Sequence, residues 1–263
     1  MHKILRILAI KWSENLQYRG DIILWTIADA LVPIIALAIW YSVAQSGNQA
    51  FPAQEVFTYY IFLTIVRATA VAWGGYFLST EILKGDIVRY LIRPLSPFII
   101  HAADNIAVKA FRLIIPISLL AVSLWQWPHL FWPTIYQPYY IVFFLLSVFL
   151  ATILNFVFDM VTAMLAFWLE DVLQIREYQN MLYEIASGTL IPLAFLPSTI
   201  RNIFEFLPFR YMLSTPVEIL LGRISGIDIW YQLGIQLLWI IASAITVSFL
   251  WKKGLKIYAI PGQ

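Results

Sequence analysis

The chain contains 263 residues, of which 61% are hydrophobic and only 12% are charged. Soluble domains average near half apolar and a quarter charged residues, so this composition excludes a soluble globular protein and indicates a polytopic membrane protein. The chain has no cysteine, which excludes disulfides and thiolate metal sites, and its formal net charge of +2 gives no reason to expect nucleic acid as a partner. Its three histidines lie too far apart in the sequence to suggest a metal site.

The first segment, residues 2–21, has the pattern of an amphipathic helix. Its apolar residues recur at helical spacing, with the charged residues off that stripe, at Ile4, Leu8, Trp12 and Leu16. We expect this helix to lie in the membrane interface before the chain turns into the bilayer near Gly20. It would serve either as an electrostatic anchor or as a contact with another subunit. No cleaved signal peptide is evident.

Six segments are long and apolar enough to cross a bilayer, which takes roughly 20 residues per helix. These segments are 22–45, 56–79, 106–127, 138–166, 180–196 and 230–251. The sequence shows no clear internal repeat, and no soluble domain or flexible linker separates the spans. The sequence therefore predicts an all-α integral membrane fold in which residues 1–263 form a single transmembrane domain.

The distribution of basic residues predicts the orientation of this domain. Most of the 17 Lys and Arg residues lie before the first predicted span, between residues 84 and 112, or after residue 251. The opposite side has only Arg201, Arg210 and Arg223, and Arg67 falls inside a span. Because cytoplasmic loops are enriched in Lys and Arg, we expect both termini to be cytoplasmic.

A short basic segment, GDIVRYLIRPLSP at residues 85–97, separates the second and third predicted spans. Asp86 can cap a helix there and Pro94 must end it. Its apolar and basic residues fall on different faces, with Ile87, Val88, Leu91 and Ile92 on one and Arg89 and Arg93 on the other. We expect this helix to lie flat beneath the membrane with its basic side available to a partner, or to act only as a topology determinant.

The segment 197–228 is too long for a plain turn and too polar to span. Its prolines predict two short helices, at 198–207 with Ser198 as the cap and at 215–221 with Pro216 in the first turn and Gly222 after the end. Its apolar side predicts a re-entrant hairpin in the outer leaflet. The candidate residues of this hairpin are Pro208, Phe209, Arg210, Tyr211, Pro216, Glu218 and Gly222.

Several polar residues fall inside the predicted spans, where ionisable groups are costly and therefore functional candidates. They are Asp29, Arg67, Asn155 and Asp159, with Glu184 near the start of the fifth span. Arg67 needs a partner, and Asp29 or Asp159 could supply one. The pair would either lock helices together or line a path for a charged substrate. No run of titratable groups crosses the membrane, which argues against a proton relay.

Two stretches resemble a known family. The pattern E-I-x-x-G-D-I-x-R-Y-L-I-R-P-L-S-P, residues 81–97, is similar to the cytoplasmic signature of ABC-2 type permeases, in particular a multidrug-exporter-like branch of uncharacterised bacterial permeases. A second stretch, F-L-P-F-R-Y-M-L-S-T-P-V-E-I-L-L-G at residues 206–222, also matches. The similarity covers essentially the whole chain.

The resemblance implies a permease subunit of an ATP-driven exporter in the bacterial inner membrane. Such a subunit pairs with a second, similar permease, as a heterodimer or a homodimer, and with cytoplasmic ATPase subunits that bind ATP and Mg²⁺. This chain has no G-x-x-x-x-G-K-[ST] loop, so we expect it to be no enzyme by itself and to hold no cofactor. The short helix would dock on the ATPase, through a segment containing Glu81, Gly85, Asp86, Arg89, Tyr90, Leu91, Arg93 and Pro94. The resemblance also implies that the hairpin closes the outer end of the transport path; the alternative is a packed cap with no gating role.

Two other classes of function compete with this one. An ion-driven secondary transporter would favour an inverted repeat and broken helices, and the sequence indicates neither. A membrane-embedded enzyme that acts on lipid would need clustered acidic residues or histidines at the membrane surface. Glu170, Asp171 and Glu177 are the nearest group, and without a neighbouring histidine they are typical of a solvated loop.

Overall fold

The computed structural model describes residues 2–46, 52–92 and 96–258, and these residues form helices and turns without a β-strand. The α-helices are α1 (His2–Gln17), α2 (Arg19–Gln45), α3 (Ala53–Ala70), α4 (Gly74–Leu83), α5 (Val88–Ile92), α6 (Pro97–Arg112), α7 (Ile114–Gln126), α8 (Pro138–Met164), α9 (Val172–Ala186), α10 (Ser198–Glu205), α11 (Pro208–Leu220) and α12 (Ile227–Tyr258). Four 3₁₀ turns lie between them: η1 (Pro128–Leu130), η2 (Pro133–Tyr136), η3 (Leu165–Phe167) and η4 (Leu193–Phe195). The all-α prediction is confirmed.

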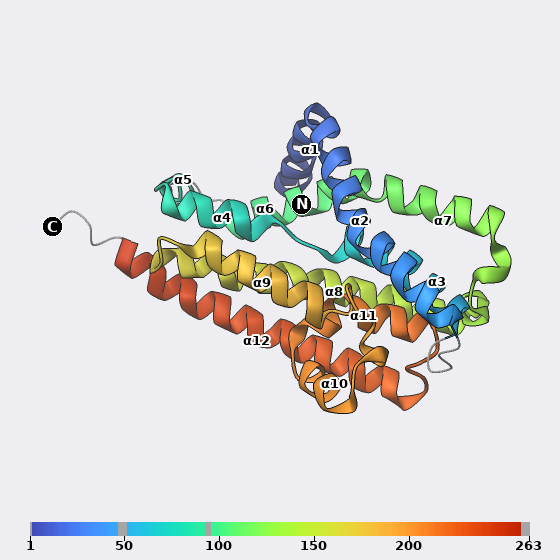
Figure 1. Cartoon of the computed structure of the whole chain (residues 1–263). Coiled ribbons are helices and arrows are strands. Elements are labelled where there is room, and N and C mark those ends of the chain that lie inside the picture. The colour runs from blue at the N-terminus through green and yellow to red at the C-terminus, as the bar shows by residue number, and fades with distance from the viewer. Residues whose placement is uncertain (1, 47–51, 93–95, 259–263) are drawn as a thin grey trace.

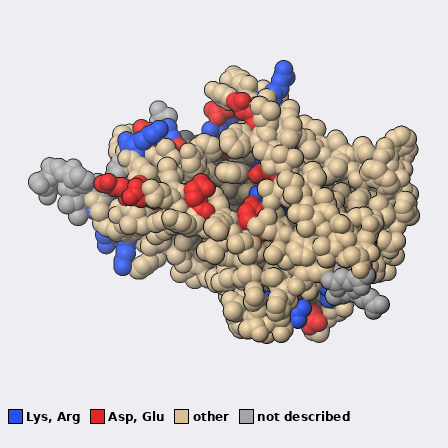
Figure 2. Space-filling model, viewed as in Figure 1, with Lys and Arg blue, Asp and Glu red and all other residues tan. Residues whose placement is uncertain are grey.

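Helix α8 lies at the centre of the bundle, in contact with α3, α4, α11 and α12 (Figure 1). Many of its inward residues are small or apolar, and Ala151, Leu154 and Ala163 are fully buried, but the polar Asn155 and Asp159 are buried as well. The predicted interfacial segment forms α1, which packs against α6 with the Trp12 and Phe111 ring centroids 5.0 Å apart. Most of the surface in Figure 2 is neither acidic nor basic, and charged side chains gather mainly over the end that carries α5.

Within the described part of the chain, five segments are long and apolar enough to cross a membrane: Arg19–Gln45, Ala53–Leu83, Pro97–Gln126, Pro138–Phe167 and Ile227–Ile257. They overlap five of the six predicted spans. The other predicted span, 180–196, is not one continuous helix, because α9 ends at Ala186 and the chain turns at Gly188, which has a φ of +86°. The lengths and apolarity of the described helices therefore support five spans, and the predicted count of six is not confirmed.

The second of these spans is a broken helix. Helix α3 ends at Ala70, Val71 is extended with ψ at 134°, and α4 begins at Gly74. This finding corrects the expectation that the sequence contains no broken helix. The apolar pattern does not indicate this break, because residues 71–73 are Val, Ala and Trp, which continue the apolar run without a proline.

The segment after η4 also differs from its prediction. Helix α10 has Pro197 at its N-cap, so Ser198 lies inside the helix and does not cap it by a side-chain hydrogen bond. The second short helix begins at Pro208, not near residue 215, and passes through Pro216. Pro208 suits the first helical turn, where the missing N–H leaves no hydrogen bond unmade. Every residue of α11 is buried.

Candidate functional site

The turn between α4 and α5 depends on Gly85. Its φ of +83° lies in the left-handed region, which glycine adopts without steric cost. Ile87 then points inward and is fully buried in a cluster with Leu78, Ile82 and Met160. Asp86 accepts a hydrogen bond from the Arg89 amide through its backbone carbonyl, at 3.2 Å. The turn thus fixes α5 against the end of α4.

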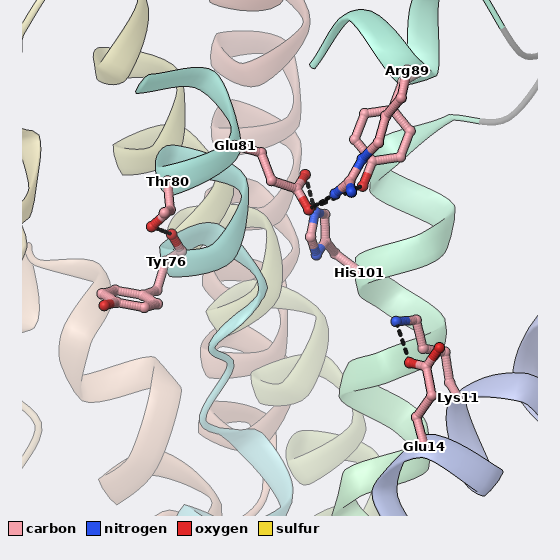
Figure 3. A network of polar contacts seen from close by, with 8 residues as sticks. Lys11, Glu14, Tyr76, Thr80, Glu81, Arg89 and His101 are labelled. Carbon is pink, nitrogen blue, oxygen red and sulfur yellow. Dashed lines mark hydrogen bonds and ion pairs between the residues drawn. The ribbon is translucent and has the colours of Figure 1, made fainter. Parts of the chain in front are cut away.

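Glu81, on the last turn of α4, joins α5 to α6 (Figure 3). Its Oε1 accepts hydrogen bonds from the Arg89 guanidinium and, at 3.1 Å, from the Tyr90 hydroxyl. Its Oε2 lies 3.2 Å from Nε2 of His101 on α6. Burial and the nearby Glu81 carboxylate raise the pKa of Tyr90 to about 12, so its hydroxyl stays protonated and donates this bond at neutral pH. One carboxylate therefore ties three helices together.

The outward side of α5 carries both basic and apolar groups. The Arg89 side chain is 52% exposed although it contacts Glu81, and Ile92 is 79% exposed. Val88 is exposed as well. Ile87 is buried while Val88 and Ile92 are not, so only part of the apolar side of α5 packs against the other helices. The side chain of Leu91, and Arg93 and Pro94 altogether, lie outside the described residues.

The other end of α4 is held by α8. The Gly75 amide, at the start of α4, donates a hydrogen bond to Oδ2 of Asp159 at 2.6 Å. A Cβ on Gly75 would lie 2.7 Å from Cγ of Asp159 and closer still to its backbone carbonyl, so only glycine fits. The carboxylate thereby binds one of the amides that the break in the span leaves without a helical partner.

Asp159 is also paired with Arg176, through Oδ1 and the guanidinium, and both residues are buried. Arg176 lies on α9. A single carboxylate on α8 thus connects the start of α4 with α9. Asp159 was one of two predicted partners of Arg67, and the structure assigns it to Arg176 and Gly75 instead.

Arg67 lies within a second group of charges. Its Nη2 is 2.6 Å from Oε1 of Glu184 on α9 and 3.7 Å from Oδ1 of Asp29 on α2. Asp29 is paired in turn with Arg112 of α6. The predicted pairing with Asp29 is present, and the closer partner is Glu184. Figure 2 shows charged side chains of both signs in the hollow between α2 and α9.

Asn155 supplies the hydrogen bond that a proline inside α11 cannot donate. Pro216 has no N–H, so the carbonyl of Met212, four residues earlier, has no helical donor. The Asn155 side chain on α8 donates to that carbonyl at 3.2 Å and to the Ala151 carbonyl at 2.9 Å. Its side-chain oxygen accepts a hydrogen bond from the Tyr183 hydroxyl at 3.0 Å. Asn155 therefore holds α11 on α8 where the helix is interrupted.

The predicted hairpin residues lie together around Arg210. Its guanidinium is within 2.7 Å of both Glu205 and Glu218, and the Tyr211 hydroxyl donates to the Glu205 carbonyl at 2.8 Å. Pro208 and Phe209 begin α11, and Phe209 packs on Phe158 of α8 with ring centroids 5.6 Å apart. Gly222, with a φ of +72°, turns the chain after α11.

The acidic residues considered for a lipid enzyme do not form a site with a histidine. Glu170, Asp171 and Glu177 are all exposed. Among the described residues, no group of three His, Asp or Glu side chains could hold a metal ion.

The architecture is that of a multi-pass helical membrane protein with a short helix fixed between two spans. Residues 22–262 match the family described as ABC-2 family transporter protein. This match covers nearly all of the chain and confirms the resemblance, so the protein belongs to the ABC-2 transporter family. A comparison with curated proteins gave no match.

Proposed function

We propose that this chain is the membrane-spanning subunit of an ATP-driven exporter, and that α5 receives the movement of a separate ATPase. The family supports a transmembrane component of an ABC exporter. The observation that carries the coupling role is the exposed pair Arg89 and Ile92 on a helix fixed to α4 and α6 by Glu81. A partner that binds this side of α5 gains both an apolar and a charged contact, and the rigid anchorage passes its movement on.

The route into the bundle runs along α4. Its far end is bound to Asp159, which also binds Arg176 of α9. Residues 71–73 separate α4 from α3, so α4 can tilt without bending the rest of the second span. A movement of α5 would therefore reach α8 and α9 through one carboxylate. Coupling of this kind requires that α5 have two positions. A partner shifts the equilibrium between them only by binding one position more tightly than the other.

A sixth crossing is supported by the course of the chain. The C-terminal end of α12 lies at the same end of the molecule as α5 (Figure 1), and so does the end of α8. The chain must return between α8 and α12, and α9 runs along α8 over that path. Its charged residues Arg176 and Glu184 bind other helices, whereas Tyr178, Met181 and Leu182 face outward. We therefore propose that α9 and residues 187–196 form the sixth crossing, with both termini cytoplasmic.

In this proposal ATP and Mg²⁺ bind to the partner ATPase, and this chain catalyses no reaction. A second, similar permease completes the membrane unit, as a heterodimer or a homodimer in the bacterial inner membrane. The residues 198–222 either close the outer end of the path or cap it. The ion pairs of Arg210 with Glu205 and Glu218 support a fixed position for this segment.

The broken second span is a feature that secondary transporters also use, to bind ions with the freed backbone groups. Here the freed groups bind to side chains of the protein. The Gly75 amide is bound by Asp159, and the Thr69 carbonyl accepts a hydrogen bond from the Thr152 hydroxyl at 3.3 Å. This use of the break supports the ATP-driven exporter over ion-driven transport.

The test is retention of an ATPase by the tagged chain, expressed with its genomic neighbours and purified in mild detergent. We expect an ATPase to copurify, and Ile92→Asp and Arg89→Ala to reduce its retention at least about tenfold, which is ~1.4 kcal/mol. Lys84→Ala, an exposed change at the same end of the molecule, is the matched control and should retain it. A well-folded wild type that retains no ATPase, or equal retention by all variants, would contradict the proposal.

A further inference from the structure

A cavity lies between α10, α11 and the turn that contains η4. It has a volume of about 370 Å³, which is within the size range of small-molecule sites. One wall is apolar and consists of residues 192–194. The other is polar and includes Arg201 and Glu205 of α10, Arg210 and Glu218 of α11, and Arg223. This cavity is separate from α5 and from the charged group around Arg67.

The charges on the polar wall are unevenly paired. Arg210 is one cation in contact with two carboxylates, with its Nη1 2.7 Å from Glu205 and its Nη2 2.7 Å from Glu218. Arg223 is paired with Glu55, with Nη2 and Oε2 3.1 Å apart, and this pair adds no net charge. One negative charge therefore remains uncompensated beside Arg210. Glu205 is the more accessible of the two carboxylates, because its side chain is 42% exposed.

Arg201 carries a positive charge that equals the surplus negative charge beside Arg210, but the Arg201 side chain does not contact those carboxylates. It lies one helical turn before Glu205, so both side chains are on the same side of α10. Glu205 is nevertheless turned toward Arg210. Over residues 2–46, 52–92 and 96–258, the Arg201 side chain has no ion-pair or hydrogen-bond partner. The cavity thus has a free positive charge at Arg201 and a surplus negative charge at Glu205.

The outer side of α10 is apolar. Ile200, Ile203 and Phe206 are exposed, Phe206 to 81%. An amphipathic helix of this kind places its apolar side in hydrocarbon and its polar side in water or in a polar site. A ligand with a hydrocarbon part could therefore reach the cavity along α10 and place that part against residues 192–194.

We propose that this cavity binds the zwitterionic part of an amphiphile, with a phosphate or carboxylate at Arg201 and an ammonium group at Glu205. Each ligand charge would then compensate one surplus charge, which neither a simple anion nor a simple cation does. Two sources share this chemistry: the phosphoethanolamine headgroup of a lipid and a free zwitterion. The proposal concerns a binding site only, and it does not depend on ATP coupling or on the ligand being transported.

The test is native mass spectrometry of the full chain in detergent, titrated with dioleoylphosphatidylethanolamine and, separately, with the anionic dioleoylphosphatidylglycerol. We expect the zwitterionic lipid to bind more tightly. Arg201→Gln and Glu205→Gln should each weaken its binding at least about tenfold, whereas Lys252→Gln, an exposed change on α12, should not. Size-exclusion profiles that match the wild type would show that the variants are folded.

Soluble glycerophosphoethanolamine, a zwitterion that keeps the phosphodiester of the lipid headgroup, is added to the same titration to separate the two sources. Competition with the lipid would show that the cavity recognises the headgroup itself, including that of a free zwitterion. Absence of competition, with the variant effects intact, would assign the site to the lipid. Equal binding of the anionic lipid would overturn the proposal. So would wild-type binding by both Arg201→Gln and Glu205→Gln.

Discussion

The Gly75 amide and the Asp159 carboxylate form a 2.6 Å hydrogen bond between the start of α4 and the C-terminal part of the central helix α8. This bond lies at the point where the second span is broken, and α4 leads from there directly to α5. Asp159 is held in place by Arg176 of α9. The contact therefore connects the segment proposed to bind the ATPase with two helices of the membrane domain.

We expect Gly75→Ala to disrupt this contact. The new methyl group would overlap the backbone of Asp159, which cannot move as a flexible side chain would. Overpacking of this kind costs about 1–3 kcal/mol. Chemical unfolding in mixed micelles would measure the loss, and ATPase activity of the reconstituted complex with and without cargo would measure coupling. Gly234→Ala on α12 is the control, because no atom lies within 4 Å of its added Cβ. Equal stability of the two variants would contradict the close approach seen at Gly75.

Asp159→Asn should lower the free energy of unfolding by more than the similar size of the two side chains suggests. It leaves Arg176 buried beside a neutral amide, and removal of one partner from a buried pair costs about 3–5 kcal/mol. The double variant Asp159→Asn with Arg176→Met removes the unpaired charge, so we expect it to unfold at a higher denaturant concentration than Asp159→Asn alone. If the double variant were the less stable of the two, the pair would not be the cause of the loss.

The sequence was sufficient to predict the features that depend on local composition. Long apolar runs predicted five spans that the structure has, and Asp86 with Pro94 predicted a short helix where the structure has α5. The features that it could not predict depend on contacts between distant residues. The break at 71–73 is stabilised by Asp159, and α11 continues through Pro216 because Asn155 binds the freed carbonyl. Pairing of Arg67 with Glu184 also required the position of α9.

The role of Asn155 leads to a non-additive prediction. Asn155→Leu should leave the Met212 carbonyl buried without a donor, at a cost of about 1–3 kcal/mol. Pro216→Ala restores an N–H within α11 that can bond to that carbonyl. In the Pro216→Ala background, Asn155→Leu should therefore cost clearly less, and a double-mutant cycle of unfolding free energies would measure the difference. Additive effects would show that Asn155 stabilises the protein by other contacts, such as that with Tyr183.

The last prediction separates a structural role of Arg67 from a role in a transport path. Arg67→Met leaves Glu184 without its 2.6 Å partner, and Glu184→Met leaves Arg67 with only the more distant Asp29. We expect each single variant to lose about 1–3 kcal/mol of unfolding free energy. The double variant leaves Asp29 and Arg112 as a neutral pair, so it should recover part of that loss. Transport by the double variant should follow its stability if the pair only joins α3 to α9. A stable double variant that binds its ATPase but no longer transports would show instead that Arg67 or Glu184 contacts the cargo.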